Sequence, residues 1–438
     1  MDWRETYRRR LVSAEEAVKA IRHKDRVVIP IGCNPQLLGD TLAARMDDLE
    51  DVEVAHTATG WPYLWLQPGL EGPFNVVHEH WASPLGWEAM KGRHHDFLPA
   101  PFSLRFKGAE DGRTPAEQRL PDVVMVQVTP PDENGMVNLG PHLWNQKEYI
   151  ARARNALAEV SNRIPRCHGD TELPVESFSH FVEYDSPSLA ARHLRPGPAV
   201  QAIARYVSEI VRDGDTLQIG GGSTSFGVAY CEPFQDKLDL GWHAEITPSP
   251  VLRLVRDGVV TGRRKAIDQG KAVSCGIVGD EEDWAYLQEN PAFALRGCSY
   301  VLDPRNIAAN DNAVAINAAL MVDLTGQIAS ESIGPTMLSG TGGLLEVVIG
   351  TLWSRGGRSI TVLPATSDEG KTSRIVPLLP EGTVVSVPRL LADIVVTEHG
   401  VARLLGKTMR ERADELIAVA HPDLRADLRA EAQRLLYP

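Results

Sequence analysis

Apolar and polar residues follow one another along the chain in blocks that predict helices leading into short buried strands. In the first block Ser13 is a suitable N-cap, with Glu16 three residues later, for a helix over 14–21. The apolar run 25–32 follows and ends in glycine, as a core strand entering a loop does. This block therefore predicts a helix and strand of an α/β domain.

The same order of elements returns about half a chain later. A helix is predicted over 203–211, followed by a strand over 216–219 and a run of three glycines. Two units of this construction predict two related domains. The stretches 185–188 and 195–198 are rich in Pro, Gly and Ser and predict a linker. The expected domains are therefore 1–190 and 195–438.

Alternation of helices with apolar strands predicts that both domains are α/β with largely parallel sheets. Ligands of such sheets bind beyond the carboxyl ends of the strands, where the glycine loops fall. The strands 121–128 and 320–324 are each followed by a glycine turn and a second apolar segment, which predicts two hairpins. The tail 409–436 is rich in Ala, Leu, Arg and Glu and predicts solvated helix.

Composition excludes several classes of protein. The net charge of −13 argues against nucleic-acid binding, because an acidic surface repels phosphate backbones. Five scattered cysteines without a Cys-x-x-Cys pair favour reduced thiols in the cytoplasm. With no apolar run near 18 residues and no signal peptide, we expect no membrane span. The histidines of 78–80 and 94–95 lack a framing set of carboxylates, so no metal site is predicted.

Two glycine-rich loops are candidates for ligand binding. The loop Gly220, Gly221, Gly222, Ser223 and Thr224 closes a buried strand, so its N–H groups could hold a phosphate or an amide, or it could be a plain turn. The run 339–343 precedes an apolar helix, and its glycines could aim N–H groups at a developing oxyanion or form only a tight turn. The residues alone leave both alternatives open.

A set of ordered motifs resembles the acetyl-CoA hydrolase/transferase family, which includes 4-hydroxybutyrate and succinyl-CoA:acetate CoA-transferases. The matching segments are 130–140, 165–170, Gly-Trp-His-Ala-Glu at 241–245, 310–312, Gly-Thr-Gly-Gly at 340–343, 373–377, 396–400 and 421–423. They span most of the chain. The resemblance implies a homodimer whose active site lies in the cleft between the domains.

The resemblance also implies roles for single residues. Glu245 would attack an acyl-CoA thioester, and Gly342 and Gly343 would supply N–H groups to the tetrahedral intermediates. The loop 220–224, Gly340 and Lys371 would bind coenzyme A. The implied activity is exchange of CoA between an acyl-CoA and a free carboxylic acid, through an acyl-glutamyl anhydride and a glutamyl-CoA thioester. The alternatives are an acyl-CoA hydrolase and a catalytically lapsed CoA-binding protein.

Departures from the family pattern concern the acyl end of the substrate. Leu302 and Leu344 stand where relatives carry amides, and Trp61 and Trp65 belong to a segment unusually rich in tryptophan. These four residues are therefore assigned to the substrate pocket; the alternative for the tryptophans is that they are ordinary core or dimer-interface residues. An apolar lining cannot satisfy a terminal hydroxyl or a second carboxylate, so larger apolar acids are the expected acceptors.

Overall fold

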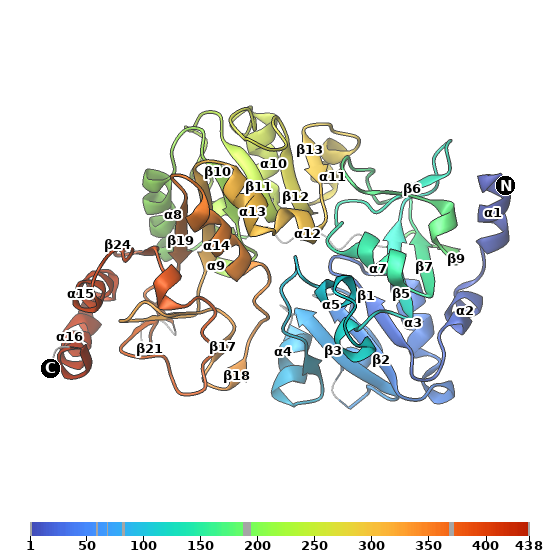
Figure 1. Ribbon diagram of the computed structural model, residues 1–438, viewed down its shortest axis with the longest axis horizontal. Coiled ribbons are helices and arrows are strands. Elements are labelled where there is room, and N and C mark those ends of the chain that lie inside the picture. Colours follow the sequence, from blue (N-terminus) through green and yellow to red (C-terminus); the bar gives the residue numbers. More distant parts are fainter. Residues whose placement is uncertain are drawn as a thin grey trace. The chain divides into compact units, whose positions relative to one another are not determined.

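The computed structural model describes residues 2–57, 60–67, 69–80, 84–186, 194–367 and 372–436. Two compact units divide the chain (Figure 1): unit 1 comprises 1–191 and 275–300, and unit 2 comprises 192–274 and 301–438. The sequence predicts each domain as one continuous stretch and places 275–300 in the second. That segment instead packs with unit 1, because backbone bridges join Gly276 to His142 and Leu295 to Gly169.

Unit 1 is built on a parallel sheet with the strand order β4-β3-β2-β1-β5-β7-β9. Its strands are β1 (Arg26–Ile29), β2 (Val52–Thr57), β3 (Phe74–His80), β4 (Asp96–Phe97), β5 (Val123–Val128), β7 (Asn155–Val160) and β9 (His180–Glu183). β1 and β5 are almost wholly buried, as strands covered on both faces are. β2, β3 and β4 follow one another on one side of β1, whereas β5, β7 and β9 lie on its other side. The carboxyl ends of β1 and β5 therefore mark a topological switch point, where ligands of open α/β sheets bind.

The helices of unit 1 are short. They are α1 (Trp3–Arg10), α2 (Ala14–Ala17), α3 (Gln36–Ala43), α4 (Pro84–Lys91), α5 (Lys107–Glu110), α6 (Pro115–Gln118) and α7 (Gln146–Arg152). The segment 275–300 adds α11 (Glu281–Leu287) and β13 (Phe293–Leu295), with β12 (Ala272–Val278) and α12 (Cys298–Val301) at its ends. The helix predicted over 14–21 is present as α2 and a following 3-10 turn, and Ser13 Oγ accepts the Glu16 N–H as predicted.

The first of the two predicted hairpins is wrong. β6 (Met136–Asn138) does not pair with β5; it pairs antiparallel with β8 (Glu172–Pro174). The reason is that β1 and β7 already occupy both edges of β5, so no edge remains for a hairpin partner. The second hairpin is confirmed, because β15 (Met321–Asp323) pairs antiparallel with β16 (Ile328–Ala329).

Unit 2 repeats the parallel architecture. The sheet strands that lie wholly within unit 2 are ordered β11-β10-β14-β19-β23-β24, and the pairings β10–β11, β10–β14, β14–β19 and β19–β23 are parallel, whereas β23–β24 is antiparallel. The strands are β10 (Thr216–Ile219), β11 (Gly241–Pro248), β14 (Ala313–Ala318), β19 (Arg358–Val362), β23 (Ile394–Thr397) and β24 (Gly400–Arg403). Smaller pairings involve β17 (Ser332–Ile333) with β18 (Thr336–Met337), β20 (Thr366–Ser367) with β21 (Thr372–Ser373), and β15 with β22 (Ile375–Val376). The predicted α/β class with largely parallel sheets is confirmed.

The helices of unit 2 include α9 and α14, which both pack against β14. The full set is α8 (Pro198–Ile210), α9 (Ser223–Tyr230), α10 (Ser249–Arg256), α13 (Pro304–Ala309), α14 (Leu344–Trp353), α15 (Met409–Val419) and α16 (Arg425–Leu436). The tail predicted as solvated helix is two helices whose Leu416, Ile417, Leu428 and Ala432 belong to a buried cluster. The tail therefore closes the core of unit 2.

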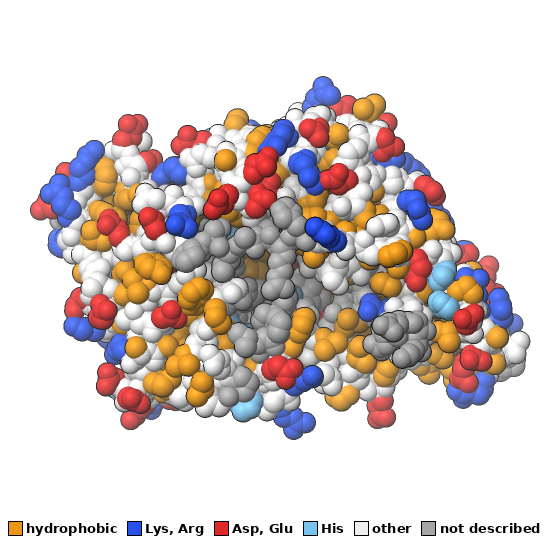
Figure 2. All heavy atoms as spheres, turned by 180° about the vertical axis from the view of Figure 1, so that it is seen from behind, with side chains coloured by type: hydrophobic (Ala, Val, Ile, Leu, Met, Phe, Trp, Pro, Cys, Tyr) orange, Lys and Arg blue, Asp and Glu red, His pale blue; other side chains and the backbone are white. Residues whose placement is uncertain are grey.

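The surface carries charges of both signs. On the face shown in Figure 2, acidic and basic side chains are interspersed and no continuous basic patch is visible among the coloured residues. No helix within the described ranges combines the length and the hydrophobicity that crossing a membrane requires.

Candidate active site

Glu245 lies within β11, on a strand fixed by buried polar contacts. Trp242 Nε1 donates to Thr247 Oγ1 at 2.8 Å, and the His243 imidazole bonds to the Val301 carbonyl at 2.9 Å. Burial lowers the pKa of His243 to about 4, so at neutral pH the ring is uncharged and Nε2–H is the donor to that carbonyl. The buried Lys265 ammonium donates to the Trp242 carbonyl at 3.0 Å. Sequence reasoning did not single out Lys265, because a lysine between two turns carries no motif.

Gly342 and Gly343 surround the carboxylate of Glu245. The Gly343 N–H donates to Glu245 Oε2 at 2.8 Å. A Cβ on Gly343 would lie 2.6 Å from the same oxygen and 2.7 Å from Leu302 Cδ2. Gly342 has φ +59°, and a Cβ there would lie 3.1 Å from Glu245 Oε1. Both positions therefore require glycine, one for space and the other for space and backbone conformation.

The surroundings of Glu245 disfavour its ionised form. Desolvation raises the pKa of Glu245 to about 7, with a further rise from the charge of Glu346, while the Gly343 N–H opposes both. Glu346 lies in the first turn of α14 and is itself buried. Glu245 nevertheless keeps partial access to solvent. The result is a partly accessible carboxylate that solvent stabilises poorly, which is a suitable state for a carboxylate nucleophile.

The loop 220–224 lies beside this strand. It connects β10 to α9, and Gly221 is close to Ile246, with 3.9 Å between a Cβ built at Gly221 and Ile246 Cγ2. Gly222 is the N-cap of α9 without a side-chain cap, and Gly221 and Ser223 are exposed. Ser225 Oγ holds the loop by donating to the Gly220 carbonyl at 2.6 Å. The N–H groups at the start of α9 can thus reach an anionic ligand.

Two buried amides under this loop were not predicted. Gln218 Nε2 donates to Asn317 Oδ1 at 3.4 Å, and a Cβ on Gly220 would lie 2.3 Å from that same Asn317 oxygen. Within the described chain, Gln218 Oε1 and Asn317 Nδ2 have no hydrogen-bond partner. Both residues stand second from the carboxyl end of a buried strand, where they alternate with their neighbours as any core residue does, so no sequence pattern distinguishes them.

The other residues of unit 2 that the sequence assigns to the site do not contact the Glu245 carboxylate directly in any contact described above. Leu302 is fully buried next to Gly343, and Leu344 packs partly buried against the core of unit 2. Gly340 is buried, two residues before Gly342. Lys371 lies outside the described residues.

The two tryptophans assigned to the substrate pocket belong to unit 1. Trp65 has no exposed surface, because its ring stacks on Tyr63 at 4.8 Å between centroids and meets Phe74 edge-on at 5.3 Å. It packs as a core residue and presents no surface to a ligand. Trp61 is half-buried, and its Nε1 donates to Asp40 at 3.1 Å.

Histidine, cysteine and carboxylate side chains do not gather into a metal-binding group anywhere in the described ranges. His78 and His95 bond to each other at 2.8 Å, and His56 packs on His78 with 4.6 Å between ring centroids. Burial lowers the pKa of His56 and that of His78, so these rings are neutral at pH 7. They form a buried aromatic cluster in unit 1.

Comparisons with known proteins identify the family of this chain. Models of the acetyl-CoA hydrolase/transferase N-terminal and C-terminal domains match residues 89–215 and 279–432. The chain is 34% identical to 4-hydroxybutyrate coenzyme A transferase of Clostridium kluyveri, over 99% of this chain and 100% of that protein. It is 35% identical to succinyl-CoA:cyclohexane-1-carboxylate CoA transferase of Geobacter metallireducens, over 98% and 96%. The crystal structure of RipA from Yersinia pestis matches with a TM-score of 0.91 at 30% identity, over 100% of both chains. The chain therefore belongs to the acetyl-CoA hydrolase/transferase family and is an enzyme of the CoA-transferase type.

Proposed function

We propose that the protein moves coenzyme A between an acyl-CoA and a free carboxylic acid, with Glu245 as the covalent nucleophile. The observation that carries this proposal is the 2.8 Å hydrogen bond from the Gly343 N–H to Glu245 Oε2. This N–H can keep its hydrogen bond to the same glutamyl oxygen after Glu245 has been converted to an anhydride or a thioester. In those intermediates the hydrogen bond polarises the glutamyl C=O bond. The glutamyl carbonyl is then activated for attack by the next nucleophile.

The reaction proceeds by two exchanges at Glu245. The carboxylate attacks the thioester carbonyl, the C–S bond breaks, and an acyl-glutamyl anhydride and the CoA thiolate result. The thiolate then attacks the glutamyl carbonyl of the anhydride, which forms glutamyl-CoA and releases the first acid as its carboxylate. An incoming carboxylate repeats these steps in reverse order and leaves with CoA. No proton, oxidant or water is consumed.

The geometry supports the Gly343 N–H as the donor for tetrahedral intermediates centred on the glutamyl carbon. In each of them the negative charge collects on a glutamyl oxygen, which already accepts this N–H in the resting state. The loop 220–224 is the proposed site for the CoA moiety, because its exposed residue Gly221 lies next to Ile246 of β11. Roles for Gly340 and Lys371 in CoA binding, a homodimer and an active site between the domains stay predictions from the family.

A hydrolase would use the same glutamate and resolve the thioester with water. The relatives named above are transferases, which favours an acid as the acceptor. A lapsed CoA-binding protein is disfavoured because the glutamate and both glycines are in place.

Measurement of CoA exchange separates these functions. Wild-type protein, given acyl-CoA and no acid, should gain a CoA adduct on the peptide that carries Glu245, seen by mass spectrometry. Added carboxylate should discharge the adduct and yield a new acyl-CoA. Glu245→Ala should abolish both the adduct and the exchange while the fold persists. Release that proceeds equally without acid would identify a hydrolase, and an active Glu245→Ala protein would exclude this nucleophile.

A further inference from the structure

A pocket of unit 1 lies at the switch point of its sheet. The loop after β1 contributes Gly32 and Cys33, β5 contributes Gln127, and the loop after β7 contributes Ser161 and Arg163. These segments meet at the carboxyl ends of parallel strands, where the sheet reverses its order and a crevice is expected.

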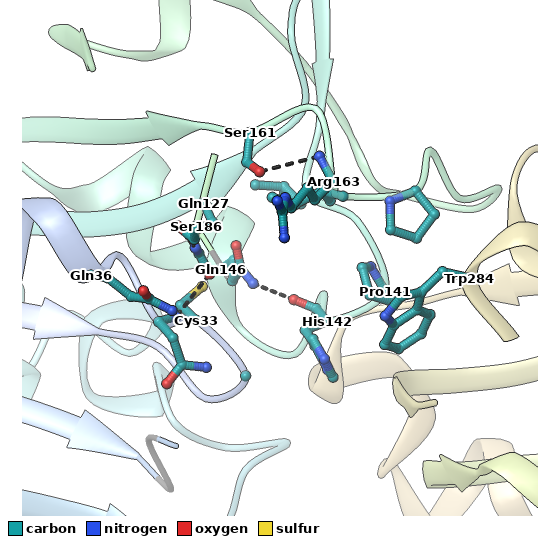
Figure 3. Close-up of a pocket in the computed structure, with 15 residues that line it drawn as sticks. Cys33, Gln36, Gln127, Pro141, His142, Gln146, Ser161, Arg163, Ser186 and Trp284 are labelled. Carbon is teal, nitrogen blue, oxygen red and sulfur yellow. Dashed lines mark hydrogen bonds between the residues drawn. The ribbon is translucent and has the colours of Figure 1, made fainter. Parts of the chain in front are cut away.

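The pocket combines an apolar wall with polar groups (Figure 3). Pro141 and Trp284 stand on one side in the view of Figure 3, and Gln36, Gln127 and Gln146 on the other. Ile164 and Pro165 also line it. Its volume is about 120 Å³. A protein cavity of about 150 Å³ accommodates benzene, so this pocket suits a ligand of about six non-hydrogen atoms and is far too small for a nucleotide.

Arg163 is the cation that lines this pocket, at an exposed position of the loop after β7. In Figure 3 its guanidinium points toward the middle of the cavity, and its backbone N–H is held by Ser161 Oγ at 3.2 Å. Within the described ranges no carboxylate pairs with the Arg163 side chain. A guanidinium presents a planar pair of donors that matches a carboxylate, and the adjoining apolar wall suits a short hydrocarbon chain.

The neighbouring helix does not compete for this anion. The first N–H groups of α3, those of Gln36, Leu37 and Leu38, all donate to the buried carboxylate of Glu159 at 2.9–3.1 Å. An internal carboxylate therefore already occupies the helix N-terminus, the position where an anion would otherwise bind. Among the described residues that line this pocket, Arg163 is the one that carries a positive charge.

We propose that this pocket binds a small aliphatic carboxylate of about four carbons, with its carboxylate on Arg163 and its alkyl chain along Trp284, Ile164 and Pro165. The choice of a carboxylate over another small anion rests on the proposed function, in which a free acid is a substrate. The existence of an anion site rests only on the pocket and its arginine.

Calorimetric titration of the full chain with butyrate, without CoA, tests the site. Butyrate should bind the wild type, and Arg163→Gln should weaken it about tenfold or more, as loss of a charged hydrogen-bond pair does. Arg163→Lys should retain part of the affinity. Arg429→Gln, at another exposed arginine, is the matched control and should leave the affinity for butyrate unchanged. Neutral butyramide should bind about tenfold more weakly or worse. The intrinsic fluorescence change on binding should shrink in Trp284→Phe while the calorimetric affinity remains.

Each contrary result has one meaning. Butyrate affinity unchanged in Arg163→Gln, or no binding to the wild type, overturns the site. Inorganic phosphate that binds as tightly as butyrate overturns the carboxylate assignment. Glu245→Ala should bind butyrate like the wild type; loss of binding there would place the acid at the nucleophile instead. An active Glu245→Ala protein would refute the proposed function and leave the pocket untouched.

Discussion

At the scale of single residues, the chemistry of Glu245 depends on two opposing influences. Desolvation and the nearby Glu346 favour the protonated carboxyl, whereas the Gly343 N–H favours the carboxylate. Only the carboxylate is a nucleophile. The balance between these influences therefore sets the fraction of enzyme that can react at a given pH.

We expect kcat/KM for acyl-CoA to rise with pH and to level off above a midpoint near 7, the pKa of Glu245. His243 should contribute no second step there, because its pKa is about 4. Initial rates from pH 5 to 9 at constant ionic strength measure the midpoint. Glu346→Gln removes the neighbouring charge and should move the midpoint downward. A midpoint near 4.5, the ordinary value for a glutamate, would show that the site does not desolvate Glu245.

The same pKa predicts a pH-dependent cost in stability. The folded-state pKa of about 7 lies above the ordinary 4.5, so folding favours the protonated form. Stability from this group is complete below pH 4.5 and is lost as pH rises through 7. Glu245→Gln should thus match the wild type at pH 4.5 and exceed its unfolding free energy at pH 8 by roughly 2–3 kcal/mol. Urea unfolding at both pH values measures the two free energies. A difference between Glu245→Gln and the wild type that is the same at pH 4.5 and pH 8 would contradict the raised pKa of Glu245.

Gly343→Ala should lower kcat by about 100- to 1000-fold, the usual effect of losing one oxyanion donor. The added Cβ would lie 2.6 Å from Glu245 Oε2 and would displace either the loop or the carboxylate. Gly197→Ala is the matched control, since Gly197 has an ordinary φ and nothing within 4 Å of its built Cβ. Steady-state kinetics should show the loss mainly in kcat, and equal losses in kcat and in CoA affinity would identify a binding loop.

At the scale of elements, the sequence predicted those that follow from local patterns and missed those that depend on partners. The strand 216–219 has the predicted bounds of β10, because an apolar run between a turn and three glycines has one interpretation. β6 was assigned to the wrong partner, because pairing depends on which edge of β5 is free, a property of the whole sheet. Glu245 was found through family resemblance, whereas Arg163, Lys265 and Asn317 carry no motif and became visible only from their surroundings.

Trp65 illustrates the same limit on the η3 turn (Leu64–Leu66). Tryptophan density suggested a substrate pocket, but the ring is enclosed by Tyr63 and Phe74. Trp65→Ala should lower the unfolding free energy by about 3–5 kcal/mol and leave the preference among acids unchanged. Leu344→Gln, at a partly buried position directly after Gly343, should alter that preference instead. Turnover with acetate, butyrate, hexanoate and a phenyl-substituted acid compares the two variants; a changed profile in Trp65→Ala would restore the pocket assignment.

At the scale of the whole molecule, the two units share one arrangement of helix, parallel strand and loop, but the groups that contact the loop differ. In unit 2 the loop after β10 leaves the first N–H groups of α9 without a side-chain cap. In unit 1 the equivalent loop after β1 leads into α3, whose first N–H groups are occupied by Glu159. Related construction was predictable from the repeated helix–strand–glycine order. The capping of α3 by Glu159 was not predictable, because Glu159 lies more than a hundred residues from the helix N-terminus that it caps.

The return of 275–300 to unit 1 has a consequence for biosynthesis. A ribosome delivers residues 1–191 long before the segment that completes their unit, and 192–274 must emerge in between. At synthesis rates of about 5–20 residues per second, the incomplete unit waits for several seconds with the backbone groups of His142 and Gly169 unpaired. Nascent chains stalled well past residue 300 should protect the 1–191 part from protease, and chains stalled near residue 250 should leave it open to cleavage. Equal protection at both lengths would mean that the amino-terminal part matures without its late segment. Because the chain leaves unit 1 and returns to it, the time for which incomplete unit 1 is open to chaperones depends on the length of the segment 192–274.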